Sequence, residues 1–382
     1  MALGLTGCVN DSLVEEPVKR PSERPSDTAT VTFMIPDTQN SFNTKADTSD
    51  PTSQEGTIND LYLVVYKKDA SGNTFTNVQC EEISSSLTSD NTSSGSKTYS
   101  LDLAPGTYKF YLLANCKDYL GSSSLTSTTD ESTLRNLILN FSDVINSSKL
   151  PMACLAEEIK ENSGGSGVEN GEVNINSDGK TLYAGLNFLC SKVRYTVLFD
   201  NTVGTGISEA FGTNVIDLAT TVGLENILST TPLAQAYSEF TSLGYLTGKT
   251  STLTRFAYPT TDLPSSTAPN LTGTASEYQK TAWQGVAYLP ENTNSEKPTT
   301  IKLTGAVYDS SYAGEGGKGT NWIKDINKTI LLPGGTTGSN NGLARNKFYD
   351  VVISVKSANL DLDVTLNVTV NPWGYESIDE EW

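Results

Sequence analysis

The sequence predicts a mainly β protein made of two β-sandwich domains with few short helices. Its 382 residues exceed the usual size of one domain. Ser, Thr, Asn and Gly recur throughout, and this composition suits short strands joined by many turns. Apolar and polar residues alternate in several stretches, as in strands with one buried face. The hydrophobic share of 36% is enough for two small sandwich cores.

The net charge and the lack of histidine exclude several classes of function. With 44 acidic and 26 basic residues the net charge is -18, so phosphate backbones repel the chain and no nucleic-acid partner is expected. The sequence contains no histidine, which excludes Ser-His-Asp and Cys-His nucleophile pairs and His-ligated metals. No spacing marks a metal, cofactor or carboxylate-pair site. We therefore expect neither an enzyme nor a bound cofactor.

Four cysteines follow Cys8 in the chain. None of Cys80, Cys116, Cys154 and Cys190 has the C-x-x-C spacing of a zinc or redox site. An exported protein could pair them as disulfides, but buried free thiols are the favoured interpretation.

The N-terminal segment resembles the end of a bacterial lipoprotein signal. Residues 5–8, LTGC, match a lipobox whose Cys8 would be diacylated, and residues 1–8 then form a truncated signal. Residues 9–27 are Pro-rich and charged, as in a disordered tether. No other apolar run approaches the roughly 18 residues of a membrane helix. Lipid would therefore be the anchor.

Most of the remaining chain predicts strands. Residues 28–35 alternate, with Val31, Phe33 and Ile35 on one face, and residues 58–68 and 106–116 are apolar enough for central strands. Further strands are expected over 184–201, 280–290, 300–309 and 347–358. Helices are expected over 131–145 and 231–243, and the Gly/Ser-rich run 161–179 predicts a linker or long loop.

A long alternating strand stands close to the C-terminus. Its apolar face would span roughly 36 Å, so the strand needs a long groove. Trp373 follows this face, which consists of Leu360, Leu362, Val364, Leu366, Val368 and Val370.

Together these segments resemble a fimbrillin-type major pilin of Bacteroidia, the subunit of a type V pilus. The resemblance rests on the lipobox, the first strand, the polar loop with Lys45, LYLVVY at 61–66, RNKFYDVVISVKS at 345–357 and VTLNVTVNPW at 364–373. Lys45 is the only basic residue between Arg24 and Lys67. The order of the motifs is more specific than any one of them.

The resemblance implies transthyretin-like sandwiches and assembly by strand exchange. The precursor would be an outer-membrane lipoprotein, cut between Lys45 and Ala46 by a trypsin-like protease. The strand with Val31, Phe33 and Ile35 would then leave its groove, and a neighbour's C-terminal donor strand would fill it. The expected product would be the stalk of an extracellular fimbria that supports adhesion. Its partners would be its own subunits and accessory anchor and tip pilins.

The expected domains are the signal 1–8, the tether 9–27, the first strand and processing loop 28–45, the sandwiches 46–185 and 186–357, and the donor strand 358–382. Some alternatives stay open. The last strand could pair within its own domain, and Arg345 and Asn346 are better explained as a turn and hydrogen-bond staple than as a ligand site. The chain could also be a lipid-anchored anchor or tip subunit, or a glycan-binding surface lipoprotein.

Overall fold

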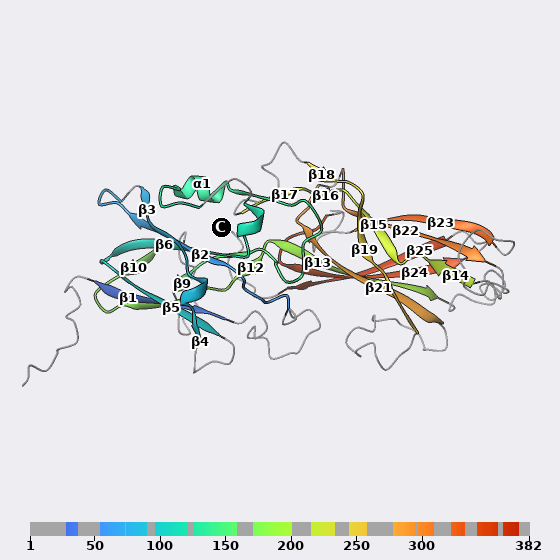
Figure 1. Cartoon of the computed structure of the whole chain (residues 1–382), viewed down its shortest axis with the longest axis horizontal. Helices are drawn as coiled ribbons and strands as arrows, with labels where there is room; N and C mark the ends of the chain where they lie inside the picture. Colours follow the sequence, from blue (N-terminus) through green and yellow to red (C-terminus); the bar gives the residue numbers. More distant parts are fainter. Residues whose placement is uncertain are drawn as a thin grey trace, which may run out of the picture.

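The computed structural model describes residues 28–36, 54–72, 74–89, 96–120, 125–158, 171–200, 215–233, 244–257, 278–294, 296–308, 322–332, 342–357 and 362–373. They form two groups of strands along the long axis, blue to green at one end and light green to red at the other (Figure 1). The predicted mainly β sandwich fold with few short helices is confirmed.

The first group contains β1 Ala29–Ile35, β2 Leu61–Lys68, β3 Phe75–Glu82, β4 Thr88–Ser89, β5 Lys97–Leu103, β6 Gly106–Ala114, α1 Glu131–Arg135, β7 Ile138–Asn140, β8 Met152–Leu155, β9 Glu157–Glu158, β10 Val173–Ile175, β11 Lys180–Tyr183 and β12 Asn187–Phe188. Short 3₁₀ turns, η1 Ser84–Ser86 and η2 Lys117–Tyr119, join some of these strands.

The second group contains β13 Cys190–Asp200, β14 Val215–Leu218, β15 Thr221–Glu225, β16 Ile227–Leu228, β17 Thr230–Pro232, β18 Tyr245–Leu246, β19 Lys249–Thr252, β20 Thr254–Ala257, β21 Tyr278–Pro290, β22 Thr300–Tyr308, β23 Trp322–Leu331, β24 Lys347–Ser357 and β25 Leu362–Pro372.

In the first sandwich, one sheet has the order β4-β5-β1-β11-β9 and the other β12-β8-β6-β2-β3, with β10 also on β6. Both sheets contribute to one hydrophobic core. The stretches LYLVVY and FYLLA lie in β2 and β6, which pair with each other inside the second sheet. Their nearly continuous burial is what a central strand requires.

The second sandwich has one sheet of order β20-β21-β13-β24-β25 and another of order β14-β22-β15-β19, with β23 on β22. β13 runs parallel to β24 and antiparallel to β21. Inward residues of both sheets form a second hydrophobic core. Among the described residues, β25 pairs with β24 alone and so lies at the edge of the first of these two sheets.

The helix predicted over 131–145 is wrong beyond its first turn. α1 ends at Arg135 and the chain continues as β7. Asp130 caps the helix by accepting a hydrogen bond from Thr133 N at 2.7 Å. Backbone bonding to residues 229–233 then draws residues 137–141 into extended structure. This tertiary pairing overrides the helical preference that the spacing of Leu134, Leu137 and Ile138 indicated.

The second predicted helix, over 231–243, begins with residues that belong to β17, and residues 234–243 lie outside the described part of the chain.

The Gly/Ser-rich run 161–179 leads back into the first sandwich, because β10 and β11 pair there. β12 also pairs with β8, so residues 187–188 stay with the first sandwich although the predicted boundary precedes them. Within the described ranges, no helix is long and apolar enough to cross a membrane.

Candidate assembly site

The first strand, β1, is an internal strand of the N-terminal sandwich. Its side chains alternate between buried and half-buried, as the sequence predicted. Val31, Phe33 and Ile35 are at most 1% exposed. β1 therefore fills a groove between its two neighbouring strands rather than lying on the surface.

Backbone pairing holds β1 on both sides. It runs antiparallel to β5 from Ala29↔Leu103 to Ile35↔Lys97, and parallel to β11 from Val31↔Lys180 to Met34↔Tyr183. At its end Ala184 N donates to Met34 O at 2.9 Å. If β1 left, both β5 and β11 would present an unpaired edge.

Polar side chains support this pairing on the outer face. Thr30 Oγ1 donates to Asp102 Oδ1 at 2.7 Å, and the hydroxyls of Thr32 and Ser100 are 2.8 Å apart. Gly179, with φ of 76°, brings its loop so close that a Cβ would lie 2.5 Å from Thr30 O. Only glycine fits there without a shift.

Aromatic rings form the floor beneath β1. The Phe33 ring meets Phe110 edge to face at a centroid distance of 5.2 Å and stacks on Tyr99 at 6.3 Å. Phe110 in turn stacks on Tyr108 at 5.8 Å. The groove therefore offers an apolar surface to whichever strand occupies it.

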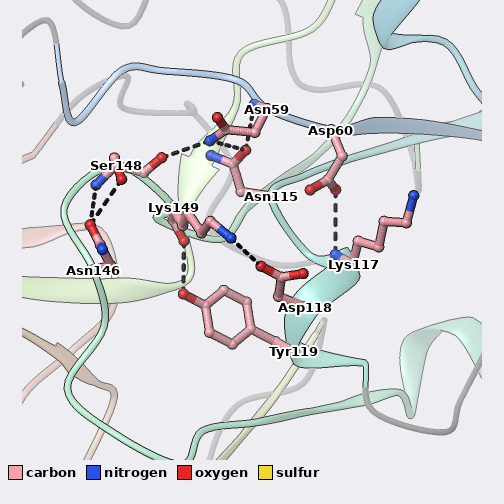
Figure 2. A network of polar contacts seen from close by, with 9 residues as sticks. All are labelled: Asn59, Asp60, Asn115, Lys117, Asp118, Tyr119, Asn146, Ser148 and Lys149. Atoms are coloured by element: carbon pink, nitrogen blue, oxygen red, sulfur yellow. Dashed lines mark hydrogen bonds and ion pairs between the residues drawn. The ribbon is translucent and has the colours of Figure 1, made fainter.

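A network of polar contacts anchors the chain just before β2 (Figure 2). Asn115, with φ of 54°, accepts from Asn59 N at 2.7 Å and donates to Thr57 O at 2.7 Å. Asn59 Nδ2 donates to Ser148 O at 2.6 Å, and Lys117 N donates to Asp60 Oδ1 at 3.3 Å. β2 is thus anchored by contacts that do not involve β1.

The C-terminal strand, β25, pairs with its own chain. Its whole length runs antiparallel to β24, from Ser357↔Leu362 to Lys347↔Pro372. Val368 and Val370 are half-buried against the second core. In this structure the strand therefore lies within its own domain, one of the two placements that the sequence left open.

Trp373 directly follows this strand and lies where the two sandwiches meet. It is fully buried, and its ring stacks on Phe188 at a centroid distance of 4.1 Å and on Tyr288 at 5.7 Å. Its backbone N–H donates to Asn346 O at 3.1 Å. Ring contacts and this backbone hydrogen bond therefore add to the strand pairing that holds β25 on its own chain.

Arg345 and Asn346 form the predicted turn and hydrogen-bond staple. Arg345 donates to Glu291 at 2.8 Å and to the carbonyls of Pro232 at 3.0 Å and Leu233 at 3.1 Å. Asn346, with φ of 54°, accepts from Phe188 N at 3.2 Å and donates to Asn187 Oδ1 at 3.0 Å. Asn346 thus joins the start of β24 to β12 of the first sandwich, and Arg345 joins it to Glu291 and to the end of β17.

The family described as "Major fimbrial subunit protein (FimA)" matches residues 29–225, just over half of the chain. The chain belongs to the FimA family. The suspected relation to Bacteroidia fimbrial subunits is therefore confirmed. No curated protein matches the sequence.

Several solved structures of fimbrial proteins are loosely similar to this FimA-family chain. The tip fimbrial protein Mfa3 of Porphyromonas gingivalis, with C-terminal truncation, is 13% identical with a TM-score of 0.45, covering 91% of this chain and 100% of its own. A fimbrial assembly protein of Parabacteroides distasonis is 13% identical with a TM-score of 0.44, covering 90% and 98%. The anchor protein Mfa2 of Porphyromonas gingivalis is 10% identical with a TM-score of 0.39, covering 91% and 100%. The family assignment rests on the match to residues 29–225.

The structure describes part of the predicted site of this FimA-family subunit. Cys8, Lys45, Ala46 and Leu360 lie outside the described residues. Leu362, Val364 and Leu366 lie in β25. Among the described residues there is no group of three or more His, Cys, Asp or Glu side chains that could hold a metal ion. Cys80, Cys116 and Cys190 are free thiols and Cys154 is buried, and burial raises the pKa of Cys116 and Cys190, which makes them poor nucleophiles.

Sequence reasoning missed the polar residues that join the elements. Asn115 follows a buried strand, and its preference for positive φ was an available signal. Glu55, Lys192 and Tyr288 meet between the sandwiches. Nothing in their local sequence indicates that contact.

Proposed function

We propose that this FimA-family chain is a stalk subunit that polymerises by strand replacement. The observation that carries the proposal is the position of β1, a buried internal strand joined to the rest of the chain through the segment that contains Lys45. A cut between Lys45 and Ala46 would separate β1 from β2, which the Asn115 network holds independently. The resulting groove would have two unpaired edges and an apolar floor.

The C-terminal strand has the properties required of a replacement strand. Its apolar residues alternate like those of β1, so the same face can enter the groove. Among the described residues β25 pairs with β24 alone, whereas a strand between β5 and β11 pairs on both sides. Each added backbone hydrogen bond contributes about 0.5–1.5 kcal/mol net. This difference favours transfer to a neighbour, and strand addition is a known mode of recognition.

Export and anchoring complete the proposal. Cys8 would carry the lipid of an outer-membrane precursor, and a trypsin-like protease would release subunits into an extracellular fimbria. The partners would be further copies of the chain and accessory anchor and tip pilins. No catalytic role is proposed.

The pairing of β25 with β24 supports a second candidate function, because a subunit whose β25 stays on its own chain would donate no strand. Such a chain would be an anchor or tip subunit, or a self-contained glycan-binding surface lipoprotein. The N-terminal residue of subunits isolated from fimbriae separates the candidates. Ala46 on most subunits supports the stalk role, whereas acylated Cys8 on most of them contradicts it.

A further inference from the structure

A buried ionic cluster lies where the two sandwiches meet the end of the C-terminal strand. Lys192 Nζ, from β13, is 2.9 Å from Glu55 Oε1 and 3.0 Å from Oε2. The Tyr288 hydroxyl, from β21, donates a hydrogen bond to the same carboxylate. The side chains of Lys192 and Glu55 are 9% and 2% exposed, so water screens the pair very little.

Trp373 covers this pair. The Lys192 ammonium lies 5.9 Å from the Trp373 ring centroid, and the Tyr288 ring stacks on the same indole. We call Glu55, Lys192, Tyr288 and Trp373 the Glu55 cluster. Glu55 thus fixes two groups that both contact the last described residue of the tail.

Trp373 has weaker backbone support than Lys192 and Tyr288. Lys192 pairs with Tyr288 on β21 and with Phe348 on β24, which holds both Lys192 and Tyr288 inside the sheet, whereas Trp373 follows β25, which among the described residues pairs with β24 alone. Trp373 Nε1 is also buried without a hydrogen-bond partner among the described residues. Any opening that brings water to Lys192 therefore proceeds most easily by release of Trp373 and β25.

We infer that Glu55 holds the C-terminal strand on its own chain. Without its carboxylate, Lys192 would be an unpaired buried cation, and breaking a buried pair in this way is strongly destabilising. Release of Trp373 and β25 relieves this cost by hydrating the ammonium, while both sandwiches stay folded. The role of this release in assembly rests on the proposed function, but the release itself is a property of the single uncut chain.

The test is hydrogen exchange by mass spectrometry on the uncut full-length monomer. Glu55→Gln keeps the size of the side chain and removes its charge, and residues 362–373 should exchange at least about tenfold faster. Residues 29–35 should exchange as in the wild type. In the double variant Glu55→Gln/Lys192→Met the unpaired cation is absent, so protection of the tail should return to within about threefold of wild type.

Glu131 provides a matched control. Its carboxylate is 2.8 Å from Lys109 Nζ and accepts from the Tyr111 hydroxyl at 2.7 Å, so it forms the same kind of Glu-Lys-Tyr cluster away from the tail. Glu131→Gln should leave exchange in residues 362–373 unchanged.

Three results would overturn the inference: an unchanged tail in Glu55→Gln, an equal loss of tail protection in Glu131→Gln, or loss of protection throughout the chain. None of them bears on the N-terminal residue of fimbrial subunits, so the proposed function fails or survives separately.

Discussion

Replacing Phe33 by alanine tests whether β1 fills the groove of the N-terminal sandwich. The Phe33 side chain is fully buried and packs on Phe110 and Tyr99. A Phe→Ala change in a core costs about 3–5 kcal/mol, which includes the cavity that it leaves. For a folding unit of about 150–250 residues, each kcal/mol lowers Tm by about 2–4 °C. The uncut variant should therefore melt about 6–20 °C lower than wild type.

The assay is circular dichroism melting of the uncut proteins, with Val78→Ala as the control. Val78 is 48% exposed on the edge strand β3, so its truncation should change stability by about 0.5 kcal/mol or less. After a cut at Lys45 and removal of the first strand, wild type and Phe33→Ala become the same molecule and should melt together. If the uncut Phe33→Ala protein melts with the wild type, β1 does not fill the core and the groove argument fails.

Two substitutions and one peptide test other parts of the chain. Lys45→Ala should accumulate as uncut lipidated monomer, because no other basic residue lies between Arg24 and Lys67; immunoblots of surface fractions measure this, and normal fimbriae from the variant would contradict it. A peptide of residues 360–373 should bind the cut protein after removal of its first strand and cap elongation but ignore the uncut form; equal binding in calorimetry would mean that β1 does not occupy the docking groove. Burial raises the pKa of Tyr195 from 10.0 to about 12, so its folded form retains a proton that the unfolded form loses, and stability should fall as pH rises from about 10 to 12. Tyr195→Phe should reduce that loss in urea titrations at several pH values, and an unchanged pH slope would exclude this tyrosine as a cause.

Local pattern was sufficient wherever a side chain's burial follows from its position along one strand. The alternation at residues 28–35 predicted the buried face of β1, and the continuous apolar stretches predicted the internal strands β2 and β6. The order of short motifs at the two ends also indicated the FimA family. These inferences succeed because a strand's period of two relates sequence directly to the face of a sheet.

The wrong helix prediction for residues 131–145 shows where prediction from local sequence pattern fails. The spacing of Leu134, Leu137 and Ile138 suits a helix, but a strand pairing with residues 230–232, 90 to 94 positions later in the chain, decided the conformation of β7. Short segments have weak intrinsic preferences, so a distant partner can override them.

The sequence by itself determined the strand-rich fold, the apolar face of the first strand and the alternation of the C-terminal strand, because each depends on neighbouring residues only. The tertiary structure alone decided that β1 lies between β5 and β11, that β25 pairs with β24, and that Glu55 meets Lys192 and Tyr288 beside Trp373. An alternating strand fits any groove with a matching apolar floor. Which cation lies beside a buried carboxylate depends on how the backbone folds. The choice among such partners depends on which surfaces the whole chain brings together, and no local pattern encodes it.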